Sequence, residues 1–192
     1  MAPKNKPEVK LETPAIEIKA AKLKDDFCNY SYELTEGVTA GDVCNRSGAS
    51  IVHDDMKLSF KNLNVHLAVI CEEISPNEID IDNLPDINNE TLKGKEKQLA
   101  KRIDSFAVSA FKIDGTGENE GVVLIGTKKL SSGDYLKLEA PKVKWSENYD
   151  FIQELMADVS ECKNEVEEYM NGKTAPKMVQ QDLFDDNENS GQ

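Results

Sequence analysis

The sequence predicts an α+β fold in which a mainly antiparallel β-sheet is covered by a long C-terminal helix. Three segments rich in β-favouring residues are separated by glycine-containing stretches, which is typical of an antiparallel meander. Leu136 and Leu138 alternate with charged residues, so we expect one face of the sheet to be buried and the other to be exposed to solvent. A long amphipathic stretch follows and ends at Asn171 and Gly172. An OB-like arrangement of the strands is compatible with this pattern.

The first half of the chain contains one predicted strand and one predicted helix. Residues 27–34 have the aromatic and polar pattern of a strand. After His53, either Asp54 or Asp55 can cap a helix whose apolar residues recur at helical spacing. The apolar run at residues 65–71 fits a strand or a buried helix. Residues 92–102 fit a short helix or a mobile loop.

The second half carries the clearest pattern. Strands are predicted at residues 106–113, 121–129 and 135–140. Ser146 is expected to cap a helix over residues 147–170 that packs on the sheet. Its apolar residues recur at steps of three and four positions: Tyr149, Ile152, Leu155, Met156, Val159, Val166, Tyr169 and Met170.

These elements predict one domain with two extensions. Residues 1–24 are expected to be a flexible N-terminal extension, in which residues 15–19 alternate like an edge strand. Residues 25–172 are expected to form a single α+β domain, and residues 173–192 a flexible acidic C-terminal tail. With 192 residues, of which 39% are hydrophobic, the chain has enough apolar material for one core.

Composition also narrows the classes of protein. No run approaches the roughly 18 apolar residues of a membrane helix, and no apolar stretch of a secretory signal follows the first residues. We therefore expect a cytoplasmic protein of a bacterial host cell that does not bind membranes. Four cysteines without C-x-x-C spacing and two histidines predict neither a metal site nor a cofactor.

The net charge of −13 argues against broad binding to duplex DNA, because neutralising phosphates requires a basic surface. Acidity in one tail can, however, mask a basic groove elsewhere. Single strands bind where lysines lie beside aromatic side chains on which bases stack. The candidates are Tyr30, Tyr32, Lys128, Lys129, Tyr135, Lys137, Lys142, Lys144 and Trp145. For the last three, the alternative is a strand end with solvated lysines and a core tryptophan.

The acidic tail contains one apolar island. The pentapeptide that starts at Gln180 has the form Q-x-x-L-F and is similar to the peptides with which bacterial proteins bind the DNA sliding clamp. In such a peptide Leu183 and Phe184 enter an apolar pocket and supply most of the binding energy, while Gln180 hydrogen-bonds at a second subsite. The acidic surroundings also resemble the partner-recruiting tails of single-strand-binding proteins, which end on the apolar residue. The alternative is that both apolar residues pack on the body.

No convincing active site is found in the sequence. The run from His53 to Asp55 is similar to a motif of metal-dependent phosphohydrolases, but only His66 remains as a further histidine. Asp54 is more simply a helix cap. Neither a G-x-S-x-G elbow nor a phosphate-binding loop is present. We therefore expect a protein that is not an enzyme.

Several blocks of the sequence resemble a family of small proteins encoded by phages and prophages of anaerobic gut bacteria. The likeness extends over about residues 25–177 and rests on residues 27–34, 53–56, 65–73, 121–129, 141–145 and 169–177. It implies a mobile-element setting and supplies no mechanism.

The function expected from these features is an accessory role in phage or mobile-element DNA metabolism. The body would bind single-stranded DNA, and the tail would tether it to a sliding clamp or another replication protein. The main alternative is an interaction protein that inhibits or redirects a host factor without binding nucleic acid. An enzyme, such as a nuclease, is the third class.

Overall fold

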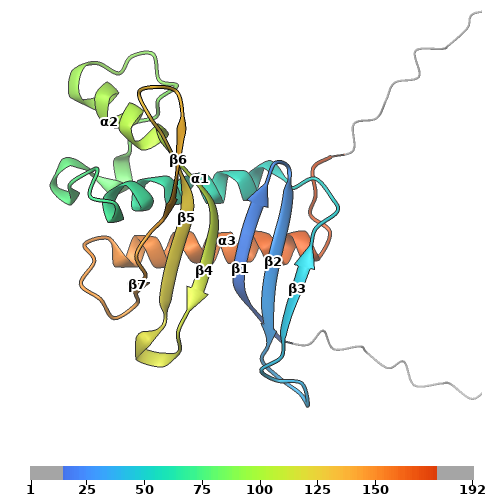
Figure 1. The fold of residues 1–192 in the computed structure, drawn as a ribbon. Coiled ribbons are helices and arrows are strands. Elements are labelled where there is room, and N and C mark those ends of the chain that lie inside the picture. The colour runs from blue at the N-terminus through green and yellow to red at the C-terminus, as the bar shows by residue number, and fades with distance from the viewer. Residues whose placement is uncertain (1–14, 177–192) are drawn as a thin grey trace, which may run out of the picture.

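A computed structural model describes residues 15–176 and places seven strands in one antiparallel sheet (Figure 1). Six strands follow one another in the order β3-β2-β1-β4-β5-β6, and β7 pairs with the first residues of β5. The strands are β1 (Ile16–Lys24), β2 (Phe27–Leu34), β3 (Val43–Ser47), β4 (Phe106–Asp114), β5 (Gly121–Lys129), β6 (Tyr135–Glu139) and β7 (Val143–Lys144). The predicted α+β class with a mainly antiparallel sheet is confirmed.

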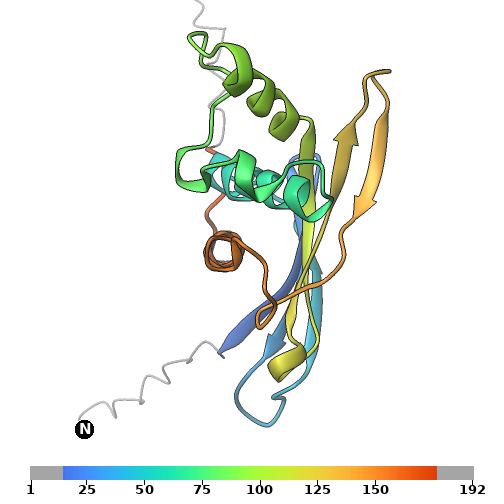
Figure 2. The same cartoon turned by 90° about the vertical axis from the view of Figure 1, so that its left-hand side faces the viewer.

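The helices lie on one face of this sheet, and the other face carries none within residues 15–176 (Figure 2). They are α1 (Asp54–Ile70), α2 (Gly94–Asp104) and α3 (Ile152–Met170). The long helices α1 and α3 run antiparallel. Asp55, at the start of α1, contacts Lys173, just after the end of α3. His66, near the end of α1, contacts Asp158, near the start of α3.

The hydrophobic core fills the space between the helices and the sheet. Phe60 of α1 meets Phe111 of β4 with ring centroids 5.8 Å apart, and each side chain is 1% exposed. Apolar residues at helical spacing turn one side of each long helix toward the strands. These residues are Met56, Phe60, Leu63 and Leu67 on α1, and Leu155, Val159, Cys162 and Val166 on α3.

The two halves of the fold repeat one another. The order of the six main strands is symmetric about the β1–β4 pair, and each half contributes three of them followed by a long helix, with the short β7 added in the second half. Ala20 pairs with Lys112 and Lys22 pairs with Ala110, which is the exchange expected across a twofold axis. The axis passes between Ala21 and Phe111, which pair with each other. We call this relation the pseudo-twofold axis.

Further features agree with this repetition. β1 has a register shift between Ile18 and Ala20, and β4 has one between Val108 and Ala110, at the corresponding point of each strand. Each long helix also packs on the first strand of the other half: α1 on β4, and α3 on β1. The segment containing α2 is inserted between the two halves.

Several sequence-based boundaries need correction. The domain begins before residue 25, because β1 pairs with both β2 and β4 at the centre of the sheet. The suggested edge strand at residues 15–19 is therefore part of a longer, central strand. An OB-like closure is wrong, since the sheet is open and ends at β3 and β6. Strand β3 was not predicted.

The predicted helices agree better with the structure than the predicted domain boundary does. Residues 65–71, left undecided between strand and helix, belong almost entirely to α1, and residues 92–102 mostly to α2. His53, not an aspartate, caps α1 by accepting a hydrogen bond from the Asp55 N–H through Nδ1 at 3.2 Å. The last helix starts at Ile152, later than the predicted residue 147, and Phe151 takes the cap position in place of Ser146.

Candidate nucleic-acid interface

The helix-free side of the sheet, called the open face below, is defined by the strand register, because paired residues point to the same side. Ala21, Tyr30 and Phe111 form one paired row that points toward the helices. The rows on either side of it therefore point away from the helices. One contains Ala110, Lys22, Asn29 and Ser47, and the other contains Lys112, Ala20, Ser31 and Asn45.

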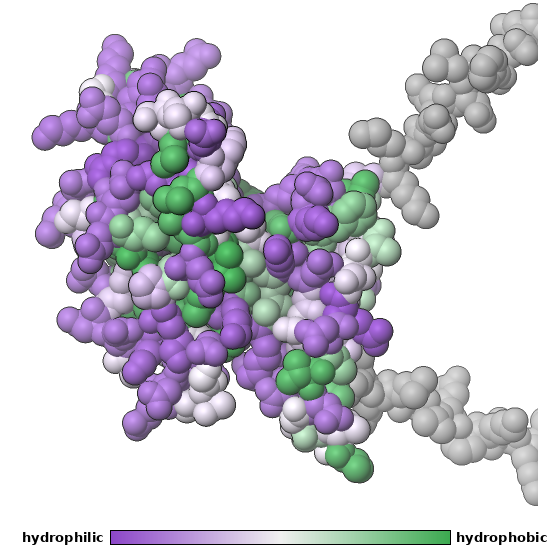
Figure 3. All heavy atoms as spheres, viewed as in Figure 1, coloured by the Kyte–Doolittle hydropathy of each residue, from purple (hydrophilic) through white to green (hydrophobic). Residues whose placement is uncertain are grey.

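A groove of about 410 Å³ lies over β4, β1, β2 and β3 on this face. Ala20, Ala110 and Ser31 are short side chains within this patch, flanked by the longer Lys22 and Lys112. The groove also reaches Asn29, Asn45, Ser47 and Ile125. We call it the central groove. Figure 3 looks onto the open face, where pale and green residues of the strand centres lie between purple, hydrophilic side chains.

Most of the acidity of the molecule lies away from this groove. Of the 36 acidic residues only Asp182, Asp185, Asp186 and Glu188 lie beyond residue 176, so the tail does not account for the net charge of −13. Helix α3 alone carries six acidic residues against one lysine, Lys163. These are Glu154, Asp158, Glu161, Glu165, Glu167 and Glu168. Helix α3 is therefore strongly acidic, whereas α1 carries two acidic residues and two lysines, and α2 carries four basic and two acidic residues.

The open face, in contrast, presents lysines with few partners. Lys112 lies 3.5 Å from Asp114. Within residues 15–176 no ion pair involves Lys22, Lys129 or Lys137. On the other side of the groove, the two glutamates Glu17 and Glu33 are held by Lys19 at 2.6 and 3.4 Å. The face thus offers ammonium groups to an anionic ligand.

Three of the predicted nucleic-acid residues reach the open face together. Lys129 pairs with Tyr135, and Thr127 pairs with Lys137, in the β5–β6 hairpin. Ile125 pairs with Ala110 and therefore points to the open face. Thr127 and Lys129 follow it at alternate positions along β5 and point to the same side, as do their partners in β6. Tyr135 is 64% exposed and offers a ring on which a base can stack.

Two predicted tyrosines are elsewhere. Tyr30 and Tyr32 point toward the helices, where their rings stack at 6.4 Å and Tyr30 meets Tyr169 of α3 edge-on at 6.2 Å. Tyr30 belongs to the row between the two outward-pointing rows of the groove. The sequence pattern marked β2 correctly as a strand, but the face to which each residue points depends on its register with β1.

The remaining predicted residues are engaged in other contacts. Lys128 pairs with Glu73 at 2.7 Å and lies 5.5 Å from the centroid of the Phe106 ring. Lys142 pairs with Asp114 at 3.0 Å. Trp145 packs partly buried against the core and donates its Nε1–H to Glu120 at 3.1 Å. Lys144 pairs with Gly121, at the opposite end of β5 from Lys129, roughly 25 Å away along the strand.

Sequence reasoning missed the residues of the central groove. Lys22 and Lys112 lie in two strands whose residues, I-E-I-K-A-A-K-L-K and F-A-V-S-A-F-K-I-D, share their pattern of apolar and polar positions except at the second residue. Aligning these two segments would have matched both lysines and the alanines two positions before them. The contribution of β3, with Asn45 and Ser47, had no such signal.

Several histidine, tyrosine and cysteine side chains that could act as nucleophiles are buried or hydrogen-bonded within the body. His66 is fully buried, with Nδ1 3.0 Å from the Tyr149 hydroxyl and Nε2 3.2 Å from Asp158 Oδ2. Burial raises the pKa of the Tyr149 hydroxyl well above its usual range, so this tyrosine is not activated. Burial also raises the pKa of Cys28 to about 11 and that of Cys162 to about 12, so neither thiol is a ready nucleophile.

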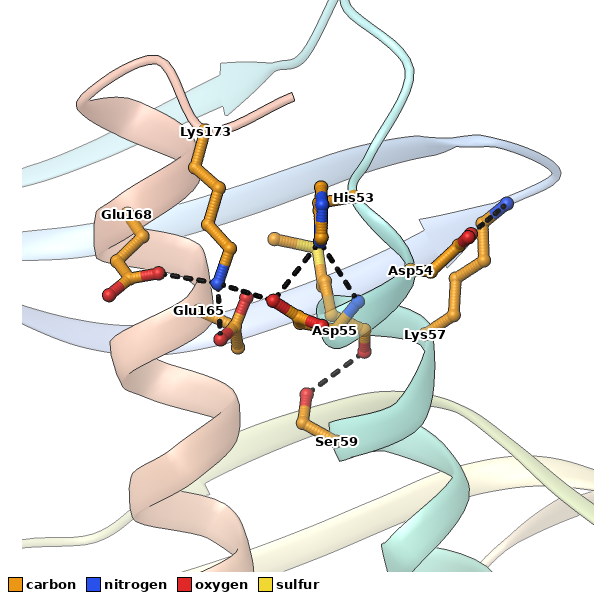
Figure 4. Close-up of polar contacts among 9 residues, drawn as sticks. His53, Asp54, Asp55, Lys57, Ser59, Glu165, Glu168 and Lys173 are labelled. Carbon is orange, nitrogen blue, oxygen red and sulfur yellow. Dashed lines mark hydrogen bonds and ion pairs between the residues drawn. The ribbon is translucent and has the colours of Figure 1, made fainter. Parts of the chain in front are cut away.

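The histidine–aspartate run is part of an ion-pair cluster (Figure 4). Lys173 Nζ contacts Glu168 at 2.6 Å, Glu165 at 2.8 Å and Asp55 at 2.9 Å. Its ammonium group occupies the place between the three carboxylates. Within residues 15–176 no three His, Cys, Asp or Glu side chains are arranged to hold a metal ion.

This cluster fixes the chain just before the tail. Thr174 forms an isolated bridge with Val52, and the Ala175 N–H donates to the Ile51 carbonyl at 2.9 Å. The body therefore holds residues 173–175, which were expected to belong to the flexible tail. The predicted clamp-binding residues Gln180, Leu183 and Phe184 lie outside the described residues.

The arrangement is that of an open-faced two-layer α+β protein with a groove at its pseudo-twofold axis. No protein-family model, curated protein or solved structure matches the chain. No helix of residues 15–176 has the length and hydropathy to cross a membrane.

Proposed function

We propose that the open face binds single-stranded nucleic acid and that the protein is an accessory factor in the DNA metabolism of a phage or mobile element in a bacterial cytoplasm. The observation that carries this proposal is the contrast in charge between the open face and helix α3. Lys22, Lys129 and Lys137 project from the open face and form no ion pair within residues 15–176, whereas α3 on the other side of the sheet is strongly acidic. An anionic strand would be attracted to the open face and repelled by α3.

A single strand fits this face better than a duplex. Duplex binders neutralise many phosphates at once, and a molecule with a net charge of −13 opposes that. A flexible strand can instead follow a narrow band of lysines and stack a base on an exposed ring such as Tyr135. The band extends from the β5–β6 hairpin to the central groove.

The proposal is tested by fluorescence anisotropy with a labelled single-stranded oligodeoxynucleotide. In the double variant Lys22→Ala and Lys112→Ala, the slope of log K against log salt concentration should decrease in magnitude by about 0.7 or more, since each phosphate that is no longer neutralised contributes about 0.7. The matched control is Lys61→Ala with Lys95→Ala, which removes two exposed lysines of α1 and α2. Equal effects of both pairs, or no binding at low salt, would contradict the proposal.

For the tail, we propose that Gln180, Leu183 and Phe184 bind the bacterial sliding clamp. The support is the Q-x-x-L-F sequence, together with the contacts of residues 173–175, which attach the chain to the body shortly before the peptide. Calorimetry with the host clamp should show binding that is lost in the double variant Leu183→Ala and Phe184→Ala. Unchanged heat in that variant would remove the tail from the proposal.

A second candidate function is an interaction protein that redirects a host factor. The observation in its favour is the β5–β6 hairpin, where Leu130, Tyr135 and Leu136 are 38%, 64% and 48% exposed. Apolar side chains at an exposed hairpin can anchor a protein partner. Capture of a host protein that survives nuclease treatment and is lost in Leu136→Asp, with no oligonucleotide binding, would favour this function.

A further inference from the structure

We propose that the central groove is a subsite for one nucleotide unit, with the phosphate between Lys22 and Lys112 and the base over the polar half formed by β2 and β3. This inference rests on the proposed function and specifies what the open face recognises.

The lysine pair is placed for one phosphate. Lys22 and Lys112 point to the same side of neighbouring strands and are diagonal neighbours, which corresponds to about 7–8 Å between their backbones. Their long side chains can converge from both sides on one anion. Lys112 has Asp114 at 3.5 Å, a contact that a phosphate would have to compete with, whereas Lys22 has no ion pair within residues 15–176.

The floor between the lysines lies close to the backbone because the positions directly opposite them are small. Ala20 is paired with Lys112 and Ala110 with Lys22, so the pseudo-twofold axis places a lysine and an alanine on each strand. Ser31 and Ser47 continue the short positions across β2 and β3. A planar group can therefore approach the backbone of the sheet in this groove.

The base is assigned to one side by comparing the two halves. Positions equivalent by the pseudo-twofold axis hold Asn29 in β2 and Val123 in β5, and Ser31 in β2 and Ile125 in β5. Asn45 in β3 corresponds to Glu139 in β6. The half with β2 and β3 thus presents amides and hydroxyls, whereas its counterpart presents aliphatic side chains and a carboxylate.

Amide side chains provide a donor and an acceptor at one edge, which matches the edge of a nucleobase. The side chains of Asn29 and Asn45 form no hydrogen bond within residues 15–176. Their donors and acceptors are therefore free for a ligand. The combination of two lysines with two free amides distinguishes a nucleotide from a simple anion.

The test compares an ordinary single-stranded oligodeoxynucleotide with an abasic one of equal length. The double variant Asn29→Ala and Asn45→Ala should weaken binding of the ordinary strand about 5- to 100-fold and leave binding of the abasic strand unchanged. The double variant Lys22→Ala and Lys112→Ala should weaken both strands. As a matched control, Asn77→Ala with Asn164→Ala removes two exposed asparagines outside the open face and should change neither.

A third arm uses deoxynucleoside monophosphates and records NMR shifts of the Asn29 and Asn45 side-chain amides. If strands bind but the asparagine variant behaves like wild type, the subsite is wrong and the proposed function stands. If no strand binds and monophosphates still shift both amides, the groove is a site for free nucleotides and the proposed function fails. If neither strands nor monophosphates bind, both inferences are overturned.

Discussion

At the scale of single residues, Asn64 shows how a buried polar side chain stabilises an irregular strand. Its Oδ1 accepts a hydrogen bond from the Val108 N–H at 2.8 Å, next to the register shift of β4. A bulge disrupts the ladder locally and leaves backbone groups without their strand partners. Asn64 therefore supplies from α1 the acceptor that the β-sheet does not.

Asn64→Ala is expected to lower the free energy of unfolding by about 1–3 kcal/mol, because the buried Val108 N–H loses its acceptor. Urea denaturation measures this loss. Asn62→Ala, on the same helix, is the control and should change the free energy of unfolding by about 0.5 kcal/mol or less. Equal effects of the two substitutions would show that the hydrogen bond to Val108 contributes nothing to stability.

Lys173 makes a pH-dependent contribution to stability. Hydrogen bonds with Glu165, Glu168 and Asp55 raise the pKa of Lys173, and the Lys173 ammonium group lowers the pKa of Asp55. A carboxylate whose pKa is lowered on folding stabilises the folded state above its ordinary value of 3.8 and loses that contribution as the pH falls. The ammonium group stays charged throughout this range.

The melting temperature of Lys173→Met should therefore fall well below that of the wild type at pH 7, where three carboxylates face one another without a cation. The gap should narrow toward about pH 3, because protonation removes the repulsion. Thermal melting at several pH values measures the gap, with Lys61→Met as a control that leaves the cluster intact. A gap independent of pH would contradict this account.

At the scale of elements, α3 is the best example of a helix encoded by its own periodicity. Leu155, Val159, Cys162 and Val166 recur at three- and four-residue steps and are all buried. Its start was less predictable, because Ser146 satisfies a cap signal that the chain does not use. Instead the Ser146 hydroxyl donates to the Glu118 carbonyl at 3.1 Å, a contact between distant segments.

Val159→Asp should lower the free energy of unfolding by about 3 kcal/mol or more, because it places an unpaired charge at a position that is 2% exposed. Ser160→Asp introduces the same charge one position later, on the exposed side of α3, and should have a small effect. Both are compared by urea denaturation. Similar losses for the two variants would mean that α3 packs through a different face.

At the scale of the whole molecule, the two halves depend on each other. α1 packs on β4, and α3 packs on β1, so each long helix covers the first strand of the other half. The contact between Phe60 and Phe111 crosses the same boundary. An isolated half would expose the apolar face that its partner normally covers.

We therefore expect residues 1–92 and residues 93–192 to lack cooperative unfolding when each is produced alone. An equimolar mixture should regain cooperative unfolding, because association buries both apolar faces. Circular dichroism during thermal melting measures this. Cooperative melting of either half alone would show that the halves are independent domains.

The sequence by itself determined the local structure wherever a periodic pattern was buried on one side. β2 and β5 were predicted at their observed bounds, and the stripe of α3 was identified because apolar residues at fixed spacing must lie on one face. The short β3 was missed because its residues are mostly exposed and carry no alternating apolar signal.

Only the tertiary structure decided which residues meet on a surface. The Tyr30 side chain points to the face of the sheet opposite the groove, and Trp145 lies at the far end of β5. Lys22 and Lys112 become neighbours across the pseudo-twofold axis. The physical reason is the register: shifting a strand by one residue turns every side chain to the other face. That register comes from pairing between segments far apart in the chain, which local periodicity does not encode.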